Sequence, residues 1–215
     1  MPRLLFEKTG DSVWISHLDL MRVFQRAFRR AGLSLKHSQG FTPRAIVSIA
    51  LPLSVGVESQ CELLDYELLE GEATAQRLNE VLPDGIRVLG IVENSRKIKD
   101  LAALRALVTF IYDNGVPNHA AERLNALFER ESLVISKHGK RGDTQTDILP
   151  MLYEKQIKQT SPTCVEMEVL VSAQNPALNP QLLLTAVEVY EPELMPDYST
   201  VKRLEIYDTE GSVFR

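Results

Sequence analysis

Residues 16–32 read SHLDLMRVFQRAFRRAG, and this segment carries helix signals at both ends. Ser16 and Asp19 have the three-residue spacing of a capping box, and Gly32 is the residue type that most often follows a helix C-terminus. The apolar residues that share one side of this helix are Leu20, Phe24, Ala27, Phe28 and Ala31. Because they recur at helical spacing, the segment predicts an amphipathic helix whose apolar side packs on a sheet.

The segments around this helix predict strands and a second helix. β-branched and apolar runs alternate with turn residues, which is typical of strands. The predicted order is a strand-like region 3–15 broken by a turn at 9–11, the helix 16–32, strands 45–51 and 60–69, a helix 72–82 and a strand 86–92. The first part of the chain therefore has the order β-α-β-β-α-β.

The same order is predicted a second time after a polar linker at 93–101. The second set comprises strands 104–112, 132–136, 163–172 and 201–207, a helix that starts near Pro117, and a helix 180–189. Two such units predict an α+β fold of two tandem ferredoxin-like sandwiches with antiparallel sheets. We expect an N-terminal unit at 1–95 that carries the basic helix, and a C-terminal unit at 102–215 with an insertion at about 147–160.

Composition limits the class of protein. The chain has 215 residues, of which 44% are hydrophobic and 25% charged, as expected for a globular protein. It lacks an apolar run of the roughly 18 to 20 residues that a membrane span needs, and its first residues do not resemble a signal peptide. We therefore expect a cytoplasmic protein with no membrane partner. Cys61 and Cys164 lie in strand-like runs, and we interpret them as small core residues in preference to a disulfide.

The charge is distributed unevenly along the chain. Residues 1–50 hold eight Lys or Arg against three acids, a net of +5, although the whole chain carries −5. No Asp or Glu lies between Asp19 and Glu58. A basic region on an otherwise acidic protein predicts contact with an anionic partner; the alternative is a chance fluctuation in composition.

A nucleic-acid-binding surface is the site that the sequence favours. Arginines gather on the polar side of the first helix, where planar guanidinium groups can pair with phosphate oxygens, and the loop that follows adds cations and an aromatic ring. The predicted binding residues are Arg22, Arg26, Arg29, Arg30, Lys36, His37, Gln39, Phe41 and Arg44. Two simpler interpretations stay open: an ordinary solvated helix face, and a tight loop that buries Phe41.

Signals for catalysis are weak. The sequence contains no zinc, iron–sulfur, P-loop, dinucleotide-binding or serine-nucleophile motif, so we expect no metal or cofactor bound by this chain. His17 and His37 are the only candidates for a general base. A histidine at such a position more often caps a helix or packs against neighbouring side chains than acts in catalysis. Glu62, Asp65 and Glu67 fall on one predicted strand, where the spacing of an edge strand explains them better than a metal site does.

The residues of the first third resemble a known family. The matching stretches are WISHLDLMRVF at 14–24, RAFRRAGL at 26–33, SQGF at 38–41 and ALPLSVGVES at 50–59. They resemble the radical-SAM-associated family of uncharacterised function. The resemblance implies a bacterial protein fused to, or encoded beside, a radical SAM enzyme, often among genes of ribosome and RNA metabolism. It also implies that S-adenosylmethionine and an iron–sulfur cluster would be held by that partner.

Three functional hypotheses follow. The leading one is an accessory RNA-binding or substrate-presenting subunit for a radical SAM enzyme encoded nearby, which acts on rRNA or tRNA and has no catalytic activity of its own. The second is a metal-independent endoribonuclease similar to CRISPR repeat-processing proteins, in which His17 or His37 deprotonates a ribose 2′-hydroxyl. The third is a protein–protein adaptor that binds no nucleic acid.

Overall fold

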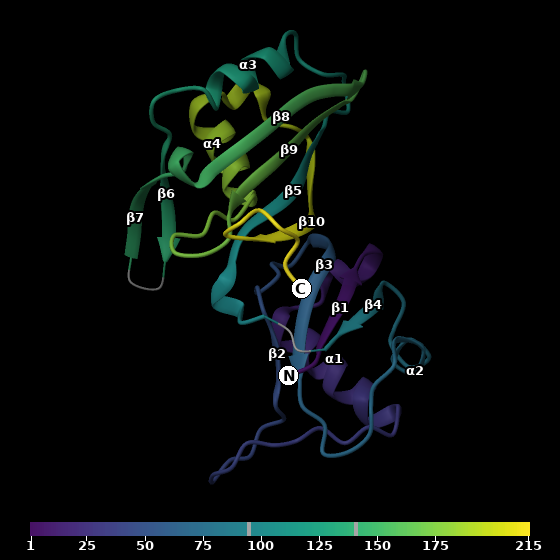
Figure 1. Cartoon of the computed structure of the whole chain (residues 1–215). Coiled ribbons are helices and arrows are strands. Elements are labelled where there is room, and N and C mark those ends of the chain that lie inside the picture. The colour runs from purple at the N-terminus through teal and green to yellow at the C-terminus, as the bar shows by residue number, and fades with distance from the viewer. Residues whose placement is uncertain (94–95, 140–141) are drawn as a thin grey trace. The chain divides into compact units, whose positions relative to one another are not determined.

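The computed structural model describes residues 1–93, 96–139 and 142–215, which form two compact units (Figure 1). The N-terminal unit comprises Met1–Asp100 together with Val213–Arg215, and the C-terminal unit comprises Leu101–Ser212. The last three residues of the chain therefore belong to the N-terminal unit.

The N-terminal unit is a ferredoxin-like sandwich. Its elements are β1 (Arg3–Lys8), α1 (His17–Arg30), β2 (Val47–Ile49), β3 (Val57–Tyr66), α2 (Ala75–Asn79) and β4 (Ile86–Val92), with a short 3-10 helix at Gly10–Trp14. The strand order is β4-β1-β3-β2, and all neighbours are antiparallel. This is the order that a β-α-β-β-α-β chain produces when each helix crosses over one intervening strand, so the predicted fold is confirmed.

The core of this unit lies between α1 and the sheet. Phe24 and Phe28 of α1 are completely buried, and the Phe24 ring meets the Phe6 ring of β1 edge-on at 4.7 Å between centroids. Phe28 packs on Tyr66 of β3 at 5.0 Å. Aromatic pairs at this separation stabilise a core beyond the area that they bury. The apolar side predicted for residues 16–32 is therefore the side that packs.

A buried ion pair joins β1 to β3. The Arg3 guanidinium donates two hydrogen bonds to the Asp65 carboxylate, at 2.6 Å and 2.9 Å, and a third to the Arg96 carbonyl at 2.9 Å. Arg3 is 1% exposed. The ring of Phe214, also buried, has the Arg3 and Arg96 guanidinium groups over it, at 5.2 Å and 4.9 Å from its centroid. These contacts fix residues 213–215 on the N-terminal unit.

The C-terminal unit repeats the same topology with an added hairpin. Its elements are β5 (Leu101–Ile111), α3 (Ala120–Leu127), β6 (Val134–Gly139), β7 (Gly142–Asp147), β8 (Leu152–Ser161), β9 (Cys164–Ser172), α4 (Gln181–Tyr190) and β10 (Tyr198–Asp208). The sheet order is β10-β5-β9-β8, which matches the ferredoxin-like order again, while β6 and β7 pair only with each other. Both α+β units of the predicted fold are therefore present.

The predicted insertion at about 147–160 is wrong, because most of that segment is β8, a strand of the main sheet. The extra element is the β6–β7 hairpin, and it contains the predicted strand 132–136 only in part. β8 lies at the end of the strand order and exposes Glu154, Gln156 and Lys158 to solvent. Polar residues protect edge strands from pairing with other chains, and they also hide the apolar alternation that identifies a strand. Residues 140–141 lie outside the described residues.

Alkaline pH is expected to destabilise the C-terminal unit through Tyr112. Its buried hydroxyl donates to the Leu194 carbonyl at 2.8 Å, and burial, followed by the nearby Asp197 and Cys164 charges, raises its pKa to about 12. Above about pH 10 the unfolded chain ionises at this tyrosine while the folded chain does not. The free energy of unfolding should therefore fall by about 1.4 kcal/mol per pH unit up to about pH 12 because of this group.

Urea denaturation followed by circular dichroism between pH 9 and 11.5 measures this effect. Tyr112→Phe should make the pH dependence shallower, whereas Tyr153→Phe, at a residue that is 54% exposed, should leave it unchanged. Equal pH dependence in the wild type and Tyr112→Phe would contradict the assignment.

Candidate nucleic-acid interface

Local sequence defines both ends of α1. The Ser16 hydroxyl accepts a hydrogen bond from the Asp19 amide at 3.2 Å, which confirms Ser16 as the N-cap. At the other end, the Leu33 amide donates to Phe28 and the Gly32 amide to Arg29, and Gly32 has a φ of +69°. This pair of bonds is a Schellman motif, which needs a left-handed residue and so favours glycine. The motif turns the chain sharply into residues 33–37.

The four predicted arginines of α1 are all exposed, but they differ in their contacts. Arg22 forms an ion pair with Asp19 at 2.7 Å, and Arg30 donates to the carbonyl of Val81. The guanidinium groups of Arg26 and Arg29 make no hydrogen bond or ion pair with any residue that the structure describes. Their donors are therefore available to a ligand.

Asp19 forms an ion pair with the first of these arginines. A hydrogen bond from Ser16 and one from Arg22, together with the charges of Arg22 and Arg26, hold the pKa of its carboxyl below the ordinary value. Asp19 is thus ionised at neutral pH and offsets part of the charge of Arg22. The net positive charge is greatest in the C-terminal half of α1, around Arg26 and Arg29.

The positive charge of residues 1–50 is less available than the sequence count suggests. Arg3 is held by Asp65, and Lys8 is completely buried, with its ammonium group donating to the carbonyls of Val13 and Ile15 at 3.0 Å and 2.7 Å. These two cations stabilise the fold and cannot contact a partner.

The acids of β3 do not lie on an edge strand. Asp65 forms the buried ion pair with Arg3, and β3 has neighbouring strands on both sides, so the edge-strand interpretation of these acids is wrong.

The loop after α1 is an ordered arm. The Ile46 amide donates to Lys36 at 2.7 Å, and the Ser38 amide donates to Arg44 at 2.8 Å, so the two sides of the loop are joined as in a hairpin. Figure 1 shows this segment as a narrow loop that extends away from β2. Phe41 lies at its end with a relative exposure of 107%, so the buried alternative for this ring is wrong. Gln39 and Arg44 are exposed on the same loop, while Lys36 forms an ion pair with Glu67 at 3.0 Å.

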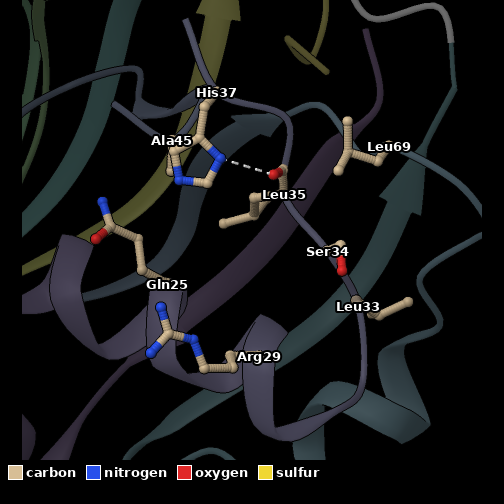
Figure 2. Close-up of a pocket in the computed structure, with 8 residues that line it drawn as sticks. All are labelled: Gln25, Arg29, Leu33, Ser34, Leu35, His37, Ala45 and Leu69. Atoms are coloured by element: carbon tan, nitrogen blue, oxygen red, sulfur yellow. Dashed lines mark hydrogen bonds between the residues drawn. The ribbon is translucent and has the colours of Figure 1, made fainter. Parts of the chain in front are cut away.

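A pocket joins α1 to the base of this loop (Figure 2). Its volume is about 320 Å³, and its walls include Gln25 and Arg29 from α1 and Leu33, Leu35 and His37 from the segment that follows the Schellman motif. The structure therefore brings together two predicted binding residues, Arg29 and His37. Gln25 is not among the predicted binding residues, although it lies four residues before Arg29 and hence on the same side of the helix.

Hydrogen bonding fixes the chemistry of the His37 ring. Its Nδ1 lies 3.0 Å from the Leu35 carbonyl, which can only accept, so Nδ1 carries a proton and donates. In the neutral ring, Nε2 is then an acceptor. Figure 2 shows this bond at the edge of the pocket.

The two candidate bases do not form one site. His17 is the first residue of α1, whereas His37 lines the pocket beside Arg29, twelve residues further along the helix. Twelve residues of α-helix span about 18 Å, so the two imidazoles cannot act as an acid–base pair on one bond.

In the described residues, no group of three His, Cys, Asp or Glu side chains is placed to hold a metal ion. None of the helices in residues 1–93, 96–139 and 142–215 has the length and apolar character needed to cross a membrane.

Fold and surface together define an α+β protein of two ferredoxin-like units with an exposed basic helix. By sequence, the chain belongs to a bacterial family described as "Uncharacterized protein conserved in bacteria (DUF2344)", which it matches over residues 2–180. That description names no radical SAM enzyme. No curated protein matches the chain by sequence.

A solved structure shares the fold at low sequence identity. A chain of "Crystal Structure of a Cbf5-Nop10-Gar1 Complex" is 9% identical, with a TM-score of 0.56 over 95% of this chain and 48% of that one. The archaeal box H/ACA sRNP Nop10-Cbf5 complex gives 10% identity and a TM-score of 0.44, over 94% of this chain and 46% of that one. This protein thus spans about half the length of each of these two chains. At such identity the likeness supports the α+β fold alone.

Proposed function

We propose that the N-terminal unit binds single-stranded RNA. The observation that carries the proposal is the combination of unpaired guanidinium groups at Arg26 and Arg29 with the fully exposed Phe41 on the adjoining loop. Guanidinium groups pair with backbone phosphates, and an exposed aromatic ring stacks on a base that is not already paired. A duplex offers phosphates but no free base face, so this combination favours a single strand.

The choice of RNA and of a partner rests on the family resemblance. The radical-SAM-associated family occurs among genes of RNA metabolism, and we extend the proposal to an accessory subunit that presents rRNA or tRNA to a radical SAM enzyme. S-adenosylmethionine and the iron–sulfur cluster would then reside on that enzyme. Purification of the protein from its native host after nuclease treatment tests this extension: the enzyme should remain associated, and its absence would limit the proposal to RNA binding.

The binding itself is tested by the salt dependence of affinity. The test variant changes three residues together to glutamine: Arg22, Arg26 and Arg29. Arg30 is retained because its side chain donates a hydrogen bond to the Val81 carbonyl. We expect log K of the wild type for a short unstructured RNA to fall with log salt at a slope of about −3, and we expect the slope of the triple variant to be shallower by about 2. Fluorescence anisotropy of a labelled oligonucleotide measures both quantities.

A matched control removes the same charge elsewhere on the unit. Arg87, Lys97 and Lys99 are exposed and lie outside α1 and its following loop, so their triple change to glutamine should leave most of the affinity intact. Equal losses of RNA affinity in both triple variants would show that binding depends on net charge alone and not on the position of the arginines. A wild type that binds no RNA at low salt would overturn the proposal and leave the adaptor hypothesis.

A further inference from the structure

The pocket beside α1 has rigid apolar walls. Leu33 and Leu35 are 5% and 7% exposed, so their side chains are fixed by the core. The backbone that carries them is also fixed, because the Ser34 carbonyl accepts from the Leu69 amide at 2.9 Å and the Lys36 amide donates to the Glu67 carbonyl at 2.9 Å. The main chain of this wall is thus already hydrogen-bonded, and recognition of a ligand falls to side chains.

Four polar side chains line the pocket, those of Gln25, Arg29, Ser34 and His37, and the lining contains no carboxylate. Gln25 and Arg29 project from successive turns of α1, and His37 faces them from the loop (Figure 2). Neither Gln25 nor Arg29 makes a side-chain hydrogen bond with the residues described. Arg29 offers paired donors, whereas the Gln25 amide oxygen and His37 Nε2 offer acceptors. The pocket therefore suits a flat ligand that has two adjacent acceptors on one edge and donors on another.

We propose that this pocket binds one unstacked guanine base of the RNA strand, an inference that rests on the proposed function. Guanine presents the adjacent acceptors O6 and N7, which an arginine fork contacts in pairs, and it carries N–H donors on its pairing edge for Gln25 and His37. The ring faces lie against Leu33 and Leu35. Adenine has an amino group in place of O6 and would place a donor against Arg29. Uracil and cytosine lack the N7 position.

The test compares short uridine oligomers that differ in one central nucleotide. We expect a guanosine at that position to raise affinity about tenfold over uridine or adenosine, and 7-deazaguanosine, which lacks the N7 acceptor, to lose that gain. Arg29→Lys keeps the charge but removes the planar fork, so this variant should bind the guanosine and all-uridine oligomers with equal affinity.

Arg26→Lys is the matched control, because it makes the same change on the same helix outside the pocket; its preference for guanosine should equal that of the wild type. The inference is overturned if the wild type binds the guanosine and uridine oligomers equally, or if the preference survives Arg29→Lys. Salt-dependent binding without base preference would leave the proposed function standing. Failure of every oligomer to bind at low salt would remove both.

Discussion

Replacement of Asp65 by alanine is expected to lower the free energy of unfolding of the N-terminal unit by about 3 to 5 kcal/mol. The change leaves the Arg3 guanidinium buried at 1% exposure without the carboxylate that accepts two of its hydrogen bonds. A buried charge that loses its partner costs more than the pair itself contributes, because desolvation is no longer offset. Urea denaturation of the full chain, with hydrogen exchange of β1 and β3 as the readout for this unit, measures the loss.

Asp11→Ala serves as the control for this change. Asp11 is exposed in the same unit, so its replacement should alter the free energy of unfolding by less than about 0.5 kcal/mol. A loss of less than about 1 kcal/mol in Asp65→Ala would show that the Arg3 charge finds water or another acceptor, and that the pair does not stabilise the unit as we infer.

Phe214→Ala is expected to cost about 3 to 5 kcal/mol in the same assay, the range for truncation of a buried phenylalanine. The ring is completely buried and contacts two guanidinium groups, so its removal leaves a cavity and also removes two cation–π contacts. Because Phe214 and Asp65 both contact Arg3, the losses of the two single variants should not add in the double variant.

Val213→Ala is the neighbouring control, since that side chain is 46% exposed and its carbonyl, which accepts from Arg96, remains. Additive losses in the Asp65 and Phe214 double variant would indicate that the ring and the ion pair act independently. A Phe214→Ala protein as stable as the wild type would show that residues 213–215 are dispensable for the N-terminal unit.

Much of the fold could be predicted because local signals and global packing agree. The Ser16 cap, the Gly32 terminus and the apolar side of residues 16–32 each specify the same helix, and β4 occupies the predicted range 86–92. Where those signals conflict, the prediction fails. The helix predicted over 72–82 is limited to Ala75–Asn79, and the polar edge strand β8 has too few apolar residues to reveal its alternation.

The candidate site was only partly predictable, because sequence gives the residue types on one helix face but not what lies opposite them. Charge and composition predict the arginines of α1 and the loop residues as candidates for binding. They do not predict the pocket, since it depends on the turn at Gly32, which brings His37 back beside Arg29. The buried state of Arg3 and Lys8 was missed for the same reason, as their partners come from other segments.

The assignment of Val213–Arg215 to the N-terminal unit has a consequence for synthesis on the ribosome. Translation adds residues 101–212 before Phe214 emerges from the ribosome. The first unit therefore lacks its last aromatic ring until the whole second unit has been synthesised. Domains generally fold in the order of their synthesis, but here the earlier one can be completed only after the later one. During that interval the Arg3 guanidinium lacks the aromatic ring that covers it in the finished protein.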